Sequence, residues 1–153
     1  MGSILLVESD PATSESWSEA LAASGHSVAT ASGIREAWTV IRDGGFDAIV
    51  VDVYDPGSGV VDLALGMNAL PDAPPIILVS DSPAAPWISV RIGAATFVPK
   101  PCDPDEVVSA VSRLLWRVRP LPIWDEPHDA TRGGASGPAW PGHPQRGSRE
   151  SPL

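Results

Sequence analysis

The stretch from residue 46 to residue 53 reads Phe-Asp-Ala-Ile-Val-Val-Asp-Val, which is apolar except at its second and seventh positions. A strand built of consecutive apolar residues is covered on both faces, as in a parallel sheet with helices on either side. Ile4–Val7 and Pro75–Val79 are short apolar runs of the same kind. These three runs predict buried strands of one parallel sheet.

Helical segments alternate with these strands. In the first of them, Trp17, Ala20 and Leu21 recur at helical spacing after Pro11, a residue type favoured at the start of a helix. We expect strands over residues 4–7, 26–31, 46–53, 75–79 and 96–98, and helices over residues 11–24, 34–41, 60–70, 87–92 and 104–118. Strict alternation predicts an α/β fold, a doubly wound five-stranded parallel sheet of (βα)5 type in three α/β/α layers.

The overall composition limits the class of protein. Hydrophobic residues make up 43% of the chain, and the formal net charge of −9 argues against non-specific nucleic-acid binding, which needs a basic surface. The single cysteine, Cys102, excludes an internal disulfide and fits a reducing compartment. We see no apolar run as long as a signal peptide or membrane span. We therefore expect a cytoplasmic protein that contacts neither nucleic acid nor membrane.

The last 34 residues differ from the rest of the chain. Residues 120–153 hold seven of the 17 prolines and five of the 14 glycines, with few apolar residues to bury. Such a composition is typical of disorder. We predict a folded domain over residues 1–119 and a disordered tail over residues 120–153, which is too short and too polar to form an output domain.

Polar residues follow the predicted strands. In parallel sheets the carboxyl ends of the strands meet at one rim, where ligands bind. This rim would gather residues 8–10, 52–55, 80–81 and 100–101, and Lys100 is the only lysine among ten basic residues. A carboxylate, a hydroxyl and an ammonium around one point can hold a phosphoryl group, with the carboxylate as nucleophile. Magnesium held by further carboxylates would neutralise the added charge.

Four phrases resemble the receiver domain of two-component response regulators. They are ILLVESDP (4–11), FDAIVVDVYDP (46–56), PPIILVSD (74–81) and GAATFVPKPCDPDEV (93–107). The resemblance covers about residues 3–118 and implies a flavodoxin-like fold. It implies that Asp52 is the phosphoacceptor, that Ser80 is the switch hydroxyl and that Phe97 is the switch aromatic. It also implies that Lys100 contacts the phosphoryl group and that the Lys100–Pro101 bond is cis.

The same resemblance implies Mg²⁺ bound by Glu8, Asp52 and the backbone carbonyl of Tyr54. Ser9 stands where the family has a second carboxylate, and serine is a poor substitute because magnesium prefers carboxylate oxygens. The site is therefore expected to be weakened. Asp10, Asp55 or Asp81 are the candidates to replace the missing ligand, although Asp10 also has the position of a helix cap. Asp81 stands where the family usually has a small residue, and its charge would oppose an incoming phosphoryl group.

Two interpretations remain open. In the first, the chain is a stand-alone receiver in phosphorelay signal transduction that accepts a phosphoryl group on Asp52 and signals by protein contacts. In the second, it is a phosphorylation-independent pseudo-receiver that acts as a protein-interaction module; Ser9 and Asp81 favour this interpretation. A remote alternative is an aspartate-nucleophile phosphatase, but the paired aspartates that such an enzyme needs after its first strand are missing from the sequence. We expect no enzymatic activity beyond the chain's own phosphorylation from a phosphodonor.

The resemblance also suggests partners. A histidine kinase or phosphotransfer protein would act upstream, and an unidentified protein downstream. Trp87 and Trp116 are candidates for exposure on the face formed by the fourth helix, the fifth strand and the last helix, which receivers commonly use for partners or homodimers. Trp17 and Trp38 are expected to be packing residues.

Overall fold

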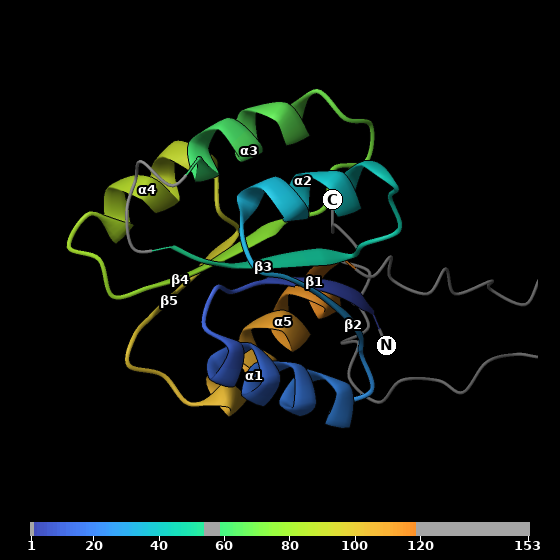
Figure 1. The fold of residues 1–153 in the computed structure, drawn as a ribbon, viewed down its shortest axis with the longest axis vertical. Coiled ribbons are helices and arrows are strands. Elements are labelled where there is room, and N and C mark those ends of the chain that lie inside the picture. The colour runs from blue at the N-terminus through green and yellow to red at the C-terminus, as the bar shows by residue number, and fades with distance from the viewer. Residues whose placement is uncertain (1, 54–58, 119–153) are drawn as a thin grey trace, which may run out of the picture. The chain divides into compact units, whose positions relative to one another are not determined.

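The computed structural model describes residues 2–53 and 59–118. Within them five strands alternate with five helices, as predicted (Figure 1). The strands are β1 (Ser3–Val7), β2 (Ser27–Ala31), β3 (Ala48–Asp52), β4 (Ile76–Ser80) and β5 (Thr96–Pro99), and the helices are α1 (Pro11–Ala23), α2 (Ile34–Arg42), α3 (Val60–Asn68), α4 (Ala85–Ile92) and α5 (Pro104–Val118). Tyr54, Asp55 and the predicted disordered tail lie outside the described residues.

The five strands form one parallel sheet in the order β2-β1-β3-β4-β5. The strand order reverses at β1, whose neighbours are β2 and β3. The register pairs Val7 with Val51 and Asp52 with Val79, so the carboxyl ends of the strands lie level along one rim. The doubly wound, flavodoxin-like sheet predicted from the sequence is confirmed.

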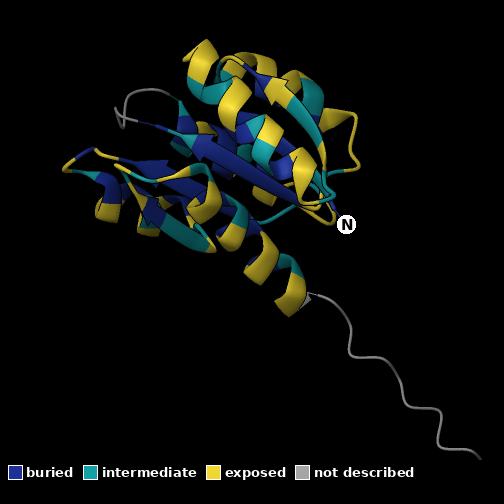
Figure 2. Ribbon diagram, turned by 90° about the horizontal axis from the view of Figure 1, so that it is seen from below, coloured by how far each residue is buried: buried dark blue, intermediate teal, exposed yellow. Residues whose placement is uncertain are grey.

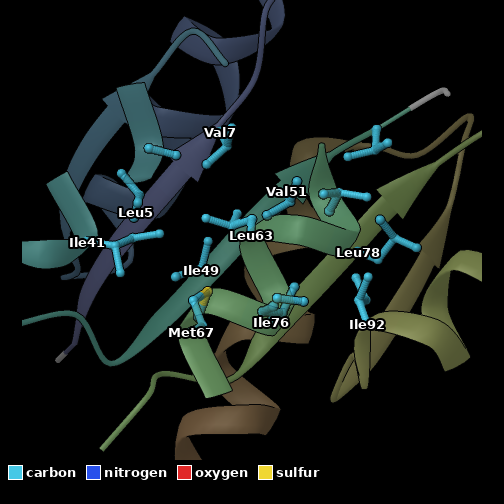
Figure 3. Packing of buried hydrophobic residues seen from close by; sticks show 14 of the residues in the cluster. Leu5, Val7, Ile41, Ile49, Val51, Leu63, Met67, Ile76, Leu78 and Ile92 are labelled. Carbon is cyan, nitrogen blue, oxygen red and sulfur yellow. The ribbon is translucent and has the colours of Figure 1, made fainter. Parts of the chain in front are cut away.

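Helices cover both faces of the sheet (Figure 1). One apolar cluster joins Leu5, Val7 and other strand residues to α2, α3 and α4, and Figure 3 shows its interior. The alternate residues Ile4 and Leu6 belong to a second cluster with α1 and α5. The central strands β1, β3 and β4 are therefore buried, and Figure 2 shows dark blue ribbons between helices with exposed surfaces. This arrangement explains why the strand sequences are apolar at consecutive positions instead of alternating.

The ends of the helices follow local chemistry. Asp10 caps α1, and its Oδ2 accepts a hydrogen bond from the Thr13 N–H at 3.0 Å, which confirms the predicted cap. The predicted start of α4 at Trp87 was wrong, because the helix begins at Ala85 and takes Pro86 into its first turn. A proline is tolerated there because N–H groups of the first turn have no intrahelical acceptor. The helix ends at Ile92, and its C-cap Gly93 adopts φ 64°.

The tryptophans in the described part of the chain divide into two pairs. Trp17 is 4% exposed and belongs to the cluster under α1 and α5. Trp38 is half-buried on α2, and the absence of a side chain at Gly66 lets its ring approach α3. Trp87 on α4 and Trp116 on α5 are 57% and 75% exposed. The expected packing role of the first pair and exposure of the second are confirmed.

Candidate functional site

The rim brings together side chains from β3, β5 and the end of β1. Lys100 follows β5, and its Nζ donates a hydrogen bond to Oδ2 of Asp52 at the end of β3. Oε2 of Glu8, which directly follows β1, lies 3.9 Å from the same Nζ. Because β1 and β3 are neighbours in the sheet, the two carboxylates and the single lysine meet as the topology predicts.

Two backbone features fix the position of the Lys100 main chain. Its N–H donates to the Ser80 carbonyl at 3.0 Å, and the Lys100–Pro101 peptide bond is cis, as predicted. From there the side chain reaches across the ends of β4 and β3, with its Nζ lying 5.3 Å from the centroid of the Trp17 ring. The sequence did not predict this ring as part of the ammonium's surroundings.

Ser80 ends β4 and is 1% exposed. Its hydroxyl donates a hydrogen bond to the Val53 carbonyl and accepts one from the Ser82 N–H at 3.0 Å. The hydroxyl thus ties the chain after β3 to the chain after β4. Both of these partners are backbone groups.

Glu8 is the most buried carboxylate of the rim, at 6% exposure. Its Oε1 accepts a hydrogen bond from the Asp10 N–H at 2.9 Å, whereas Oε2 is buried with no hydrogen-bond partner among the described residues. Burial, together with the neighbouring Asp52, raises the pKa of Glu8 to about 7, against the opposing effects of the Asp10 N–H and Lys100. The rim therefore contains an under-neutralised carboxylate.

Lys100 shows the complementary effect. Burial alone would lower the pKa of this lysine, but the hydrogen bond and charge of Asp52, with the charges of Glu8 and Asp81, outweigh it and raise the pKa. The lysine is therefore a permanent cation near neutral pH. Its charge faces two carboxylates, and one ammonium leaves the group with excess negative charge.

The side-chain oxygens of the rim determine how Mg²⁺ could bind there. The described residues contain no group of three His, Cys, Asp or Glu side chains placed to hold a metal. Ser9 and Asp81 are exposed, and the Asp10 carboxylate is bonded to its own helix. Glu8 and Asp52 remain, with the unpartnered Oε2 of Glu8 available. Magnesium often binds through one or two carboxylates and several waters, so these two residues fit the ion as a reduced ligand set.

Phe97 lies on β5 opposite Leu78 of β4. It is half-buried and packs against the apolar cluster under α2, α3 and α4. This packing connects β5, the strand that precedes Lys100, to the α4 side of the sheet. Tyr54 and Asp55, the other candidate metal ligands, lie outside the described residues.

Comparison with known proteins identifies the family. The family model described as the response regulator receiver domain matches residues 4–112. The chain belongs to the response regulator receiver family. Aspartate phosphorylation and Mg²⁺ binding at the phosphorylation site are general features of receiver domains, and these domains interact with histidine kinases or phosphotransfer proteins.

Individual relatives agree with this assignment. The DNA-binding transcriptional regulator NtrC of Azospirillum brasilense is 32% identical over 114 residues, which are 73% of this chain and 24% of the relative. The response regulator MprA of Mycolicibacterium vanbaalenii is 31% identical over 119 residues, 76% of this chain and 52% of the relative. This receiver thus spans about a quarter and about half of these two relatives.

A solved structure supports the fold. The signal receiver domain of a signal transduction histidine kinase from Syntrophus aciditrophicus superposes with a TM-score of 0.69 at 30% identity, covering 79% of this chain and 95% of that one. No helix among residues 2–53 and 59–118 is long and apolar enough to cross a membrane.

Proposed function

We propose that this receiver accepts a phosphoryl group on Asp52 in a phosphorelay and signals by protein contacts. The observation that carries the proposal is the pairing of Asp52 with the only lysine of the chain at the carboxyl rim of the sheet. A carboxylate and an adjacent ammonium are two groups that phosphoryl transfer uses. The carboxylate is the nucleophile, and the ammonium stabilises the negative charge on the phosphoryl oxygens.

The transfer would proceed at one oxygen of Asp52. This oxygen forms a bond to phosphorus while the bond between phosphorus and the donor breaks, and the donor leaves with the electron pair. Lys100 would donate to a phosphoryl oxygen, and bound Mg²⁺, held by Glu8 and Asp52, would offset the added charge. The Lys100 ammonium would then interact with the phosphoryl group as well as with Asp52.

Ser80 would then act as the switch hydroxyl. To reach a phosphoryl oxygen, its hydroxyl must leave the Val53 carbonyl, which releases the present connection between the chain after β3 and the chain after β4. Phe97 packs against the α4-side cluster from the strand next to β4, so a change there would alter its packing. Two arrangements of this region would give the domain its two states.

Incubation with acetyl phosphate and Mg²⁺, followed by intact mass spectrometry, tests the proposal. We expect the wild-type chain to gain one phosphate and Asp52→Asn to gain none. Asp43→Asn is the matched control, because it removes an exposed carboxylate at the C-terminal end of α2, which lies at the amino end of the sheet, and should leave the gain unchanged. A folded wild-type chain that gains no phosphate at any magnesium concentration would contradict the proposal.

The second candidate is a pseudo-receiver that binds its partner without phosphorylation. It is supported by Ser9, which is an exposed hydroxyl where the family has a carboxylate, and by the reduced ligand set of the described rim. The same mass measurement decides between the two, since this candidate requires no phosphate uptake. We further propose that the chain hydrolyses no external substrate. Release of nitrophenol from nitrophenyl phosphate above the level of Asp52→Asn would argue for the phosphatase alternative.

Partner contacts are proposed for the α4-β5-α5 face, with a histidine kinase or phosphotransfer protein as the upstream partner. Trp87 and Val90 of α4 are 57% and 83% exposed, and Trp116 of α5 is 75% exposed. Large apolar side chains at the surface favour association. Sedimentation with and without acetyl phosphate tests for a homodimer on this face, and Trp87→Ala should weaken any phosphate-dependent association.

A further inference from the structure

The Lys100 ammonium has a neighbour that the assignment of Asp52, Ser80 and Lys100 leaves unused. Its Nζ lies 5.3 Å from the centroid of the Trp17 ring. A cation within about 6 Å of an aromatic face is attracted by the ring quadrupole, and tryptophan gives the strongest attraction. The ring is therefore part of the electrostatic surroundings of the ammonium, together with Asp52 and Glu8.

Trp17 has a fixed position. It is 4% exposed and belongs to the buried cluster between the sheet, α1 and α5, which also contains Leu21 and Val111. The Asp10 cap defines the start of the helix that carries it. Because its surroundings are close-packed, the ring presents a stable surface beneath the flexible lysine.

The Lys100 side chain, in contrast, is flexible and needs further contacts to hold one conformation. Its side chain is 25% exposed and ends a flexible four-carbon stem. Asp52 accepts one of the three ammonium protons, while Oε2 of Glu8, at 3.9 Å from Nζ, is too distant for a hydrogen bond. One hydrogen bond leaves an ammonium free to rotate about its acceptor, and a second contact from another direction restricts that freedom.

The type of residue at position 17 matters for this contact. An aliphatic residue would fill the same part of the core, but it would offer the ammonium no attraction. The indole fills the core and attracts the charge. Core packing alone therefore does not account for the contact between the ring and the ammonium.

We propose that Trp17 is a positioning residue that holds the Lys100 ammonium against Asp52. Its effect on phosphoryl transfer rests on the proposed function, whereas the contact itself belongs to the unmodified domain. An ammonium already in place needs little reorganisation when charge develops beyond Asp52, and such preorganisation speeds transfer.

A double-mutant cycle on unfolding tests the contact without phosphate. It compares the wild type with Trp17→Leu, Lys100→Met and the double variant. We expect the two sites to be coupled by roughly fivefold or more in the unfolding equilibrium constant. Trp17→Phe, which keeps an aromatic face, should retain part of the coupling and replaces Trp17→Leu if that variant does not fold. Independent effects of the two substitutions would overturn the proposal.

The rate of phosphorylation by acetyl phosphate tests the consequence. We expect Trp17→Leu to react about fivefold more slowly than wild type, with substantial rescue in Trp17→Phe. Leu21→Ala is the matched control, because it removes apolar volume from the same helix and cluster and should keep the wild-type rate. An equal loss in Leu21→Ala, or no loss in Trp17→Leu, would overturn the positioning role.

The two experiments separate the two proposals. Coupling in the cycle without phosphate uptake by the wild type would support the contact and reject the proposed function. Phosphate uptake without coupling would reject the role of Trp17 and leave the assignment of Asp52 standing.

Discussion

The two halves of the rim differ in how their polar groups are partnered. At the ends of β3, β4 and β5, Asp52 is paired with Lys100, and the Ser80 hydroxyl has both an acceptor and a donor. At the end of β1, Oε2 of Glu8 has no hydrogen-bond partner within the described part of the chain and lies 3.9 Å from the Lys100 Nζ, and Ser9 is exposed. The first half is organised around a cation of the protein itself, whereas the second half is short of positive charge and of ligands.

This difference shows which groups can neutralise the rim. A full set of carboxylates would draw the positive charge from a metal ion, which prefers such oxygens. The resemblance to the family predicts one more carboxylate at the position of Ser9, and Lys100 faces the two acids that are present. A larger share of the neutralisation therefore falls on the lysine.

Lys100→Met should have the largest effect, because it removes the only cation of the better organised half. We expect phosphorylation to fall by on the order of a hundredfold, as for loss of one preorganised charge stabiliser. We also expect the free energy of unfolding to fall by roughly 1–3 kcal/mol, since Asp52 is left facing Glu8 without a counter-charge. Mass spectrometry and urea unfolding measure the two effects.

The control for this experiment is the Asp52→Asn, Lys100→Met double variant. Removing both charges should recover much of the lost stability, although no phosphate is taken up. Unchanged stability in the single Lys100→Met variant would show that the lysine has no structural role in the unmodified domain.

Ser9→Asp should strengthen the weaker half by supplying a third carboxylate. We expect Mg²⁺ affinity to rise about tenfold, as for a favourable ligand added to an existing site. A magnesium titration followed by tryptophan fluorescence measures this, because Trp17 lies beside Lys100 and can report changes at the rim. Ser27→Asp adds the same charge at the opposite end of the sheet and should leave the affinity unchanged.

Asp10→Ala should separate capping from metal binding. Its carboxylate accepts from the Thr13 N–H, so the substitution should lower Tm by several degrees through loss of the α1 cap. Magnesium affinity should stay the same, and Asp10→Asn, which also caps helices, should restore most of the stability. A clear loss of magnesium affinity in Asp10→Ala would show that Asp10 replaces the ligand missing at position 9.

The smallest effect is expected at the opposite edge, where His26 accepts a hydrogen bond from the Gly2 N–H through Nδ1 at 3.2 Å. Burial lowers the pKa of His26, so the folded state binds fewer protons than the unfolded state. This contribution to stability is complete above the unfolded pKa of about 6.5 and is lost as the pH falls through the lower folded value. The stability difference between wild type and His26→Gln, measured from pH 7.5 to pH 5, should shrink toward acid pH.

Much of this molecule follows from its sequence. Consecutive apolar residues in β1, β3 and β4 require cover on both faces, and alternation with helices then fixes a parallel sheet. Because strand ends share one rim, Asp52 and Lys100 could be placed together before any contact was known. The Asp10 cap followed from its position before Pro11. Local chemistry and topology were sufficient in each case.

Other features depend on packing and could not be predicted. The contact between Trp17 and Lys100 requires the rotation of α1 against α5, which spacing alone does not fix. The Ser80 hydroxyl donates to the backbone carbonyl of residue 53. Because every residue has such a carbonyl, no residue type in the sequence identifies this acceptor. The unpartnered oxygen of Glu8 reflects side-chain geometry in a crowded group of charges. The metal-ligand role of Tyr54 and the disorder of residues 120–153 stay predictions.

The position of β5 has a consequence for solubility. This strand lies at the edge of the sheet, and edge strands can pair with a strand of another molecule. Pro99 and Pro101 stand on either side of Lys100, and proline has no backbone N–H to offer to an added strand. The segment Pro99–Pro101, which positions Lys100 beside Asp52, thus also disfavours aggregation through this edge of the sheet.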